Sequence, residues 1–306
     1  MITPTDVEQL HLEFINRARS DPDGELDFLI ANPATGTGVQ SNITSALSFF
    51  GVDMDLLYDQ LDGVPSVPPL AWNTALAQSA DAHSQAMIDA DIQSHQVPGE
   101  LGLGARITAA GYTGWQQVAE NVFAYAQDPL HAHAAFYIDW GYGPGGIQSP
   151  AGHRLTMLNG LYREIGIGEL AVPASNDIGP NSHTQHFGIR PGTDAFLTGV
   201  VIDDGDGDQF YDIGEGLSGV SVTATGSAGT FSTTTWGSGG YSLELPPGSY
   251  TVTFSGGELE STVERAVTMA DVNVKIDAIA PAATDDGGGD GGGDDGGGGD
   301  GDQRIV

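Results

Sequence analysis

Hydrophobic residues recur with two different periods along the chain, and the change of period predicts two folded domains. In the first part they recur at intervals of three and four residues, as on one face of an α-helix. After Pro191-Gly192 nearly every hydrophobic run alternates with polar residues, as in half-buried β-strands. We therefore predict an α+β domain over residues 1–193 and an all-β domain over residues 194–280.

Helix signals are clear within the first domain. Thr5 and Glu8 have the spacing of a capping box, and Asn73 is a good N-cap for a helix that runs to about Ala90. His83 lies on the apolar stripe of that helix, where a buried histidine bonded to a backbone carbonyl is a commoner role than a ligand. Further helices are expected over residues 43–50, 53–61, 101–110 and 131–140.

Strand signals begin before the second domain. Residues 165–168 and 184–189 predict two strands, and we expect His183 and His186 to be polar residues at a strand edge. In the second domain, seven short alternating runs separated by Gly, Pro and Ser indicate a small β-sandwich. These runs are 197–202, 220–224, 230–235, 241–245, 250–254, 262–267 and 272–276.

Composition narrows the possible partners. The 306 residues are 39% hydrophobic and carry 41 acidic against 9 basic side chains, a formal charge of -32. Such a charge repels nucleic acid and anionic membranes and suits cations such as Ca²⁺. No apolar run approaches the roughly 20 residues of a membrane span. Without cysteine there are no disulfides or thiolate metal sites.

Both ends of the chain bear on localisation. The N-terminus lacks the basic and apolar regions of a signal peptide. The chain is therefore intracellular, or its signal was removed, or it leaves by a non-classical or C-terminal route. Residues 285–302 contain only Gly and Asp, so we expect a disordered tail over residues 281–306. The acidity, the tail and a calcium-type loop favour an extracellular or cell-surface protein.

Four polar residues set in apolar surroundings are the main candidates for chemistry: His95, Glu120, Asp139 and His153. If the fold brings them together, two imidazoles and two carboxylates form a metal site or an acid–base site. Spacing alone does not establish that they converge. A buried carboxylate is costly unless it is paired, so Glu120 needs either a partner or a water-filled cleft.

Two further histidines are expected to have no such role. His131 and His133 are two residues apart, so on a helix they face different directions. We expect both to be surface residues.

A twelve-residue loop in the second domain has the ligand spacing of an EF-hand-type loop. Carboxylates occupy positions 1, 3, 5, 9 and 12, and position 7 offers a backbone carbonyl. Position 6 is Gln209, where Gly is usual, and the flanks read as strands. Five carboxylates in twelve residues repel one another without a cation, so we expect Ca²⁺; a solvated acidic turn is the alternative. The expected ligands are Asp204, Asp206, Asp208, Phe210, Asp212 and Glu215.

An ordered set of short motifs over residues 5–193 resembles the CAP superfamily (the SCP domain of cysteine-rich secretory, antigen 5 and pathogenesis-related 1 proteins), in its bacterial branch. Each motif is weak alone, and their order makes the resemblance specific. The motifs are Leu12–Arg19, Pro69–Leu76, Ala82–Met87, Ser94-His95, Ala110–Tyr112, Ala119–Val122, Ser149–Arg154 and Glu164–Gly168.

The resemblance implies an α–β–α sandwich with a central cleft that holds two histidines and two acids. The histidines correspond to His95 and His153, and the first acid to Glu120. The second acid, a Glu in many members, falls at Asp139, whose arm is one methylene shorter. The family is credited with sterol or lipid binding. The second domain looks like the prealbumin-like B-repeat domains of bacterial surface proteins, in which such a loop binds Ca²⁺.

Three functions follow as hypotheses. The first is an exported, non-enzymatic binding module whose cleft holds a divalent ion such as Zn²⁺ or a small lipid- or sterol-like ligand, with a Ca²⁺-stiffened β-domain as spacer. The second is a hydrolase, in which a His and Glu pair, directly or through Zn²⁺, activates water. The third is a structural or adhesive surface protein without chemistry at the cluster.

Overall fold

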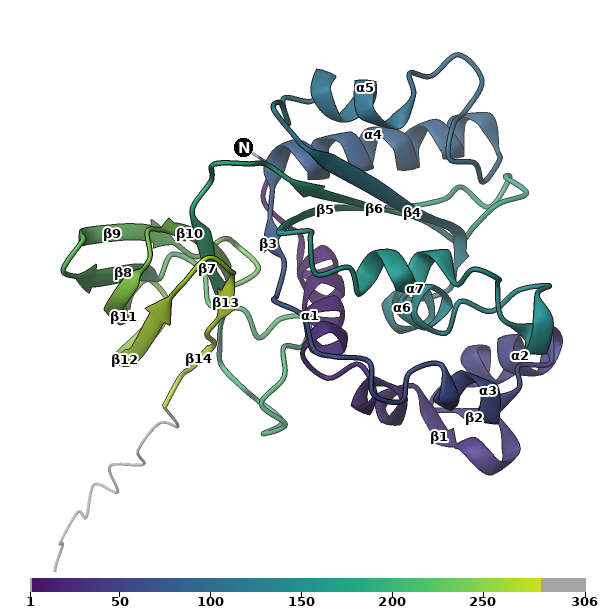
Figure 1. Cartoon of the computed structure of the whole chain (residues 1–306), viewed down its shortest axis with the longest axis horizontal. Helices are drawn as coiled ribbons and strands as arrows, with labels where there is room; N and C mark the ends of the chain where they lie inside the picture. Colours follow the sequence, from purple (N-terminus) through teal and green to yellow (C-terminus); the bar gives the residue numbers. More distant parts are fainter. Residues whose placement is uncertain (1, 282–306) are drawn as a thin grey trace, which may run out of the picture.

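The computed structural model describes residues 2–281, which form an α–β–α unit followed by a β-sandwich (Figure 1). The predicted fold class is confirmed. The expected disorder of the tail concerns residues 282–306, which lie outside the described residues.

A four-stranded sheet forms the middle of the first unit, in the order β3-β5-β6-β4. β3 pairs with β5 in parallel, and the other neighbours are antiparallel. β6 therefore lies inside the sheet, between β5 and β4. The strands are β3 (Ala71–Trp72), β4 (Gln117–Ala126), β5 (Glu164–Ala171) and β6 (Asn181–Ile189).

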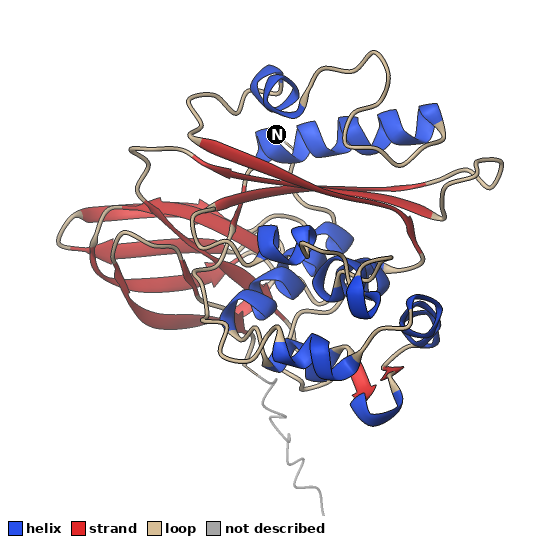
Figure 2. Ribbon diagram, turned by 45° about the vertical axis from the view of Figure 1, so that its right-hand side comes forward, coloured by secondary structure: helices blue, strands red, loops and turns tan. Residues whose placement is uncertain are grey.

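Helices cover both faces of this sheet: α4 and α5 lie on one face, and α1, α6 and α7 on the other (Figures 1 and 2). α4 packs its backbone directly on β5, because a Cβ at Gly166 would lie 1.9 Å from Ala77 N and one at Gly168 would lie 2.4 Å from Asp81 N. The helices are α1 (Asp6–Ser20), α4 (Thr74–Ala90), α5 (Leu103–Ala109), α6 (Pro129–Ile138) and α7 (Gly152–Met157).

The two predicted helix caps are confirmed. Thr5 and Glu8 form the capping box of α1, and the Asn73 side chain accepts hydrogen bonds from the first backbone N–H groups of α4. His83 is buried in α4 with Nε2 3.0 Å from the carbonyl oxygen of Ser94, so the expected role of a buried histidine bonded to a backbone carbonyl is also confirmed. Its Nδ1 lies 2.9 Å from Glu100 Oε1.

A small group of short elements lies beside α6 and α7, at the far end from the second unit (Figure 1). Leu47 of α2 and Leu57 of α3 are buried in the same hydrophobic core as Phe136 of α6. The elements are η1 (Gly24–Phe28), β1 (Ile30–Asn32), η2 (Pro33–Thr35), β2 (Thr37–Gly38), α2 (Ser41–Phe50), α3 (Met54–Asp59) and η3 (Pro144–Gly146).

The second unit packs two sheets against each other, one ordered β12-β11-β8-β9 and one ordered β10-β7-β13, with β14 also paired to β7. All seven predicted strands are present, and β14 is additional. The strands are β7 (Ala195–Ile202), β8 (Ser221–Gly226), β9 (Gly229–Thr234), β10 (Gly240–Leu245), β11 (Gly248–Gly256), β12 (Leu259–Met269), β13 (Val274–Lys275) and β14 (Ala278–Ile279).

The two units meet along α1. The Lys275 ammonium lies 2.8 Å from the buried carboxylate of Glu13, and the Phe210 ring stacks on Phe14 with centroids 5.7 Å apart. Tyr211 is buried beside the same helix. Within residues 2–281 no helix is both long and apolar enough to cross a membrane.

Candidate functional site

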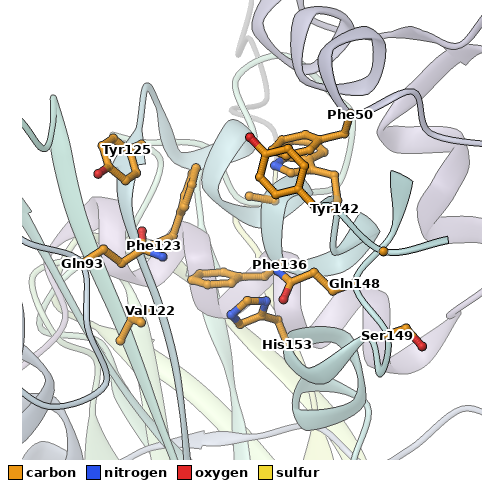
Figure 3. A pocket seen from close by; sticks show the side chains of 14 residues that line it. Phe50, Gln93, Val122, Phe123, Tyr125, Phe136, Tyr142, Gln148, Ser149 and His153 are labelled. Carbon is orange, nitrogen blue, oxygen red and sulfur yellow. The ribbon is translucent and has the colours of Figure 1, made fainter. Parts of the chain in front are cut away.

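A cavity of about 590 Å³ opens between β4, α6 and the loop that precedes α7 (Figure 3). Its wall is mostly aromatic, and its polar groups are Gln93, Gln148, Ser149 and His153. A cavity of this size with an apolar wall and a few polar groups is typical of a small-molecule site. The aromatic side chains are Phe50, Phe123, Tyr125, Phe136, Trp140 and Tyr142.

Two hydrogen bonds fix His153 in this cavity. Its Nδ1 lies 2.7 Å from Asp139 Oδ1, and its backbone N–H donates to Asp139 Oδ2 over 2.9 Å. Asp139 is fully buried and follows α6 in the left-handed conformation, with φ 59°. Since Nδ1–H donates to the carboxylate, the lone pair of the neutral imidazole is on Nε2. The ring lies 5.3 Å from Phe136, at the cavity wall.

The second acid–histidine pair is formed by Glu120 and His95. His95 Nδ1 lies 2.9 Å from Glu120 Oε1. The His95 side chain is 65% exposed, whereas that of Glu120 is 3% exposed. The hydrogen bond to Glu120 raises the pKa of His95. Its Nε2 makes no hydrogen bond with any of residues 2–281.

Glu120 has three further cationic or imidazole neighbours, which supply the partners that its burial requires. His186 Nε2 lies 2.8 Å from Glu120 Oε2, Arg106 pairs with the same oxygen, and His83 Nε2 is 3.6 Å away. Burial alone raises the pKa of Glu120, but the hydrogen bonds from His186 and His95 outweigh it and hold the pKa well below its usual range.

The four predicted cleft residues thus form two pairs, and the pairs flank β4. Glu120 and Asn121 are neighbours on that strand, so their side chains point to opposite faces of the sheet. Asn121 Nδ2 donates to His153 O over 3.2 Å, which places His153 on the face away from Glu120. Among residues 2–281, no group of three ligand atoms within 4.8 Å of one another includes any of the four residues.

His183 and His186 are not strand-edge residues, which corrects the expectation from sequence. Both are fully buried, because β6 has a neighbour on each side. Three residues apart on a strand, they face opposite sides of the sheet, and each meets a carboxylate of the neighbouring strand: Glu169 for His183 and Glu120 for His186. The sequence did contain one indication of this burial, an acidic residue in each of the two neighbouring strands: Glu120 in β4 and Glu169 in β5.

The expectation of surface positions for His131 and His133 is also wrong. Both are buried, because α6 packs against β4, α1, α7 and α2. His133 Nε2 lies 2.9 Å from Glu25 Oε1, and Arg17 makes two hydrogen bonds to the same carboxylate. His133 is a partner in a buried ion cluster.

The acidic loop of the second unit is compact. Carboxylate oxygens of Asp204, Asp206 and Asp208 lie within 4.8 Å of one another. Gln209, at the position where Gly is usual, has φ 63°, so the loop makes the expected turn without glycine. Burial and then the neighbouring carboxylates, Glu215 first, raise the pKa of Asp212.

Comparisons with known families match the two units separately. The model of the cysteine-rich secretory protein family matches residues 65–175, and that of the carboxypeptidase regulatory-like domain matches residues 197–279. No curated protein matches the chain.

Three solved structures are similar to the first unit. An extracellular SCP-domain protein of Bacillus anthracis is 25% identical with a TM-score of 0.32; the match covers 49% of this chain but only 40% of that protein. An outer surface protein of Borrelia burgdorferi is 16% identical (TM-score 0.32), with 49% and 94% covered. Venom allergen-like protein 4 of Schistosoma mansoni is 14% identical (TM-score 0.27), with 50% and 94% covered.

Proposed function

We propose that the first unit is a binding module that takes a small apolar ligand in the aromatic cavity. The observation that carries this proposal is the wall of six aromatic side chains around a single histidine. The rings supply apolar contact area, and His153, held by Asp139, offers one oriented hydrogen-bond acceptor at Nε2. A lipid- or sterol-like molecule with one polar group fits this distribution.

Binding is favoured over hydrolysis by the electrostatics of Glu120. A general base works best with a pKa near the working pH. The hydrogen bonds from His186 and His95 hold the pKa of Glu120 well below its usual range, so its carboxylate is a weak base. Its role is to orient His95 and to neutralise Arg106.

A fluorescent sterol and a fluorescent fatty acid test the proposal. We expect saturable binding to the wild type and at least a tenfold weaker affinity in Phe123→Ser/Tyr125→Ser, which removes two rings of the wall. Leu161→Ser changes an exposed apolar residue outside the cavity and is the matched control. The proposal fails if the wild type binds neither probe, or if the wall variant binds both as tightly as the control.

A divalent ion such as Zn²⁺ is a second candidate ligand, bound at His153 on one face of the sheet or at His95 on the other. His95 and His153 each place Nδ1 against a carboxylate, the arrangement that orients metal-binding histidines through their Nε2 atoms. Bound there, Zn²⁺ would act as a Lewis acid or a structural ion. Zinc that is retained by the wild type and lost from His95→Ala/His153→Ala would support this; equal zinc content would exclude it.

We further propose that the protein is exported and that its second unit is a Ca²⁺-stiffened spacer. The match to a secretory family supports the first point. For the second, the carboxylates that gather at residues 204–208 repel one another unless a cation is present. A purely structural or adhesive surface role is the remaining alternative, and it predicts no specific ligand in the cavity.

A further inference from the structure

A further histidine–carboxylate group lies on the face of the sheet opposite to Glu120 and its partners. It consists of His11 from α1, Glu169 from β5 and His183 from β6. One ligand atom of each residue lies within 4.8 Å of the other two. Both histidine side chains are fully buried, and Glu169 is 9% exposed. No step of the proposed ligand binding uses these residues.

The three side chains converge on one point. His11 Nε2 and His183 Nδ1 both contact the same carboxylate oxygen, Glu169 Oε2, the latter over 3.2 Å. The two imidazole rings lie 4.0 Å apart at 48°. Around a tetrahedral Zn²⁺ with bonds of about 2.0–2.1 Å, neighbouring ligand atoms are about 3.3 Å apart. The His183–Glu169 separation is close to that value, whereas the shorter contact between His11 and Glu169 would have to lengthen around an ion.

The second nitrogen of each histidine determines how the group could hold an ion. Gln185 Nε2 lies 3.3 Å from His183 Nε2. As these amides lie, Gln185 donates to His183 Nε2, and Asn121 donates to both Gln185 Oε1 and His153 O. An ion at His183 Nδ1 would require Gln185 to turn its amide and accept the Nε2–H. His11 Nδ1 is buried and has no hydrogen-bond partner among residues 2–281, so an ion at Nε2 would leave the Nδ1–H without an acceptor from the protein.

We propose that His11, Glu169 and His183 bind a divalent transition ion of the Zn²⁺ class in the core of the first unit. Two imidazoles and one carboxylate are ligands that Zn²⁺ accepts, and they leave one position for water. The ion would join α1 to the two inner strands of the sheet. Its role is to stabilise the fold, since none of the three residues lines the aromatic cavity.

Metal analysis of protein expressed with added zinc and purified without chelator tests the proposal. We expect about one zinc per chain in the wild type and in the cleft variant His153→Ala, and less than a tenth of that in Glu169→Gln, which keeps the shape of the side chain. If Glu169→Gln does not fold, His11→Gln, which retains a donor beside Glu169, provides the same comparison.

The outcomes separate this site from the cleft and from the acidic loop. Zinc retained in Glu169→Gln but lost from His153→Ala assigns the ion to the cleft and overturns the proposal. A wild type free of zinc also overturns it and leaves apolar-ligand binding untouched. Zinc lost only from Asp206→Ala assigns it to the loop. As a second readout, added Zn²⁺ should raise the melting temperature of metal-free wild type and not that of Glu169→Gln.

Discussion

The Asp139 carboxylate holds both the ring and the backbone of His153, with Nδ1 at 2.7 Å from Oδ1 and the amide nitrogen at 2.9 Å from Oδ2. One buried side chain therefore sets both the tautomer of the histidine in the cavity and the start of α7. The short aspartate side chain reaches His153 because the left-handed backbone conformation of Asp139, at the end of α6, directs the carboxylate toward α7.

We expect Asp139→Asn to destabilise the protein by about 1–3 kcal/mol, because two hydrogen bonds to a carboxylate become hydrogen bonds to a neutral amide and the His153 ring must take the other tautomer to accept from the amide nitrogen. Urea unfolding measures the difference. Asp89→Asn, an exposed change on α4, should stay within about 0.5 kcal/mol of the wild type. Equal stability of the Asp139 variant and this control would show that the two hydrogen bonds do not stabilise the fold.

Lys275 is the only lysine of the chain and forms an ion pair across the two units with Glu13. Burial raises the pKa of Glu13, and the nearby Lys275 ammonium opposes that shift. In Lys275→Met the carboxylate is left buried without its partner, so we expect a loss of about 3–5 kcal/mol. Lys275→Met/Glu13→Gln should recover much of this loss in thermal unfolding. If the double variant is no more stable than Lys275→Met, the loss does not come from an unpaired Glu13 carboxylate.

Acid should destabilise the protein through His133 and Glu25. Burial lowers the pKa of His133 below the ordinary value of about 6.5, so the unfolded state binds a proton that the folded state does not. Stability therefore falls as the pH drops below about 6.5. Burial raises the pKa of Glu25, but the hydrogen bonds from Arg17 and His133 outweigh burial and hold the pKa below its ordinary value. Stability is therefore lost a second time as the pH falls below about 4.3.

Replacement of His133 with Gln isolates the first loss. Gln keeps a donor for Glu25 but does not titrate. Between pH 6.5 and 5, we expect the stability of His133→Gln to fall less steeply than that of the wild type, by up to about 1.4 kcal/mol per pH unit. Chemical denaturation at several pH values measures the two slopes. Parallel slopes would show that His133 has the same pKa in the folded and unfolded states.

The sequence predicted elements better than it predicted which histidines are buried. Capping residues such as Asn73 act locally, and strand alternation reports burial on one face, so both are visible in a short window. The positions of His133 and His186 depend instead on what packs against α6 and β6 from distant parts of the chain. No local pattern carries that information.

The sequence predicted the polar residues of the candidate site but not its aromatic wall. Motif order indicated His95, Glu120, Asp139 and His153, and the structure places them in two acid–histidine pairs. The aromatic wall of the cavity was not predicted, because its rings come from three separate segments that meet only in the folded chain.

Salt should stabilise this protein. The chain carries a formal charge of -32, and like charges on a compact fold repel one another. Screening shortens the range of that repulsion from about 10 Å at 0.1 M to about 3 Å at 1 M. We expect the melting temperature to rise by several degrees between 0.1 and 1 M KCl, measured by circular dichroism. A melting temperature independent of KCl would mean that surface repulsion is negligible.

Calcium should stabilise the second unit through the loop at residues 204–215. Ca²⁺ at about 100 times its dissociation constant adds roughly 2.7 kcal/mol to folding when it binds the folded state alone. We expect a higher melting temperature with Ca²⁺ by calorimetry, and no change in Asp206→Ala/Glu215→Ala. Glu260→Ala, an exposed acid on β12, is the matched control and should respond like the wild type.

The Gln209→Gly variant tests whether the turn at residue 209 sets the calcium affinity of the loop. Gln209 has φ 63°, a conformation that costs an ordinary residue on the order of 1 kcal/mol and that glycine adopts freely. If the turn must keep this shape to gather the carboxylates, glycine should leave the Ca²⁺ response intact and tighten binding by a few fold. A calcium affinity unchanged by Gln209→Gly and by Asp206→Ala alike would place any bound Ca²⁺ outside this loop.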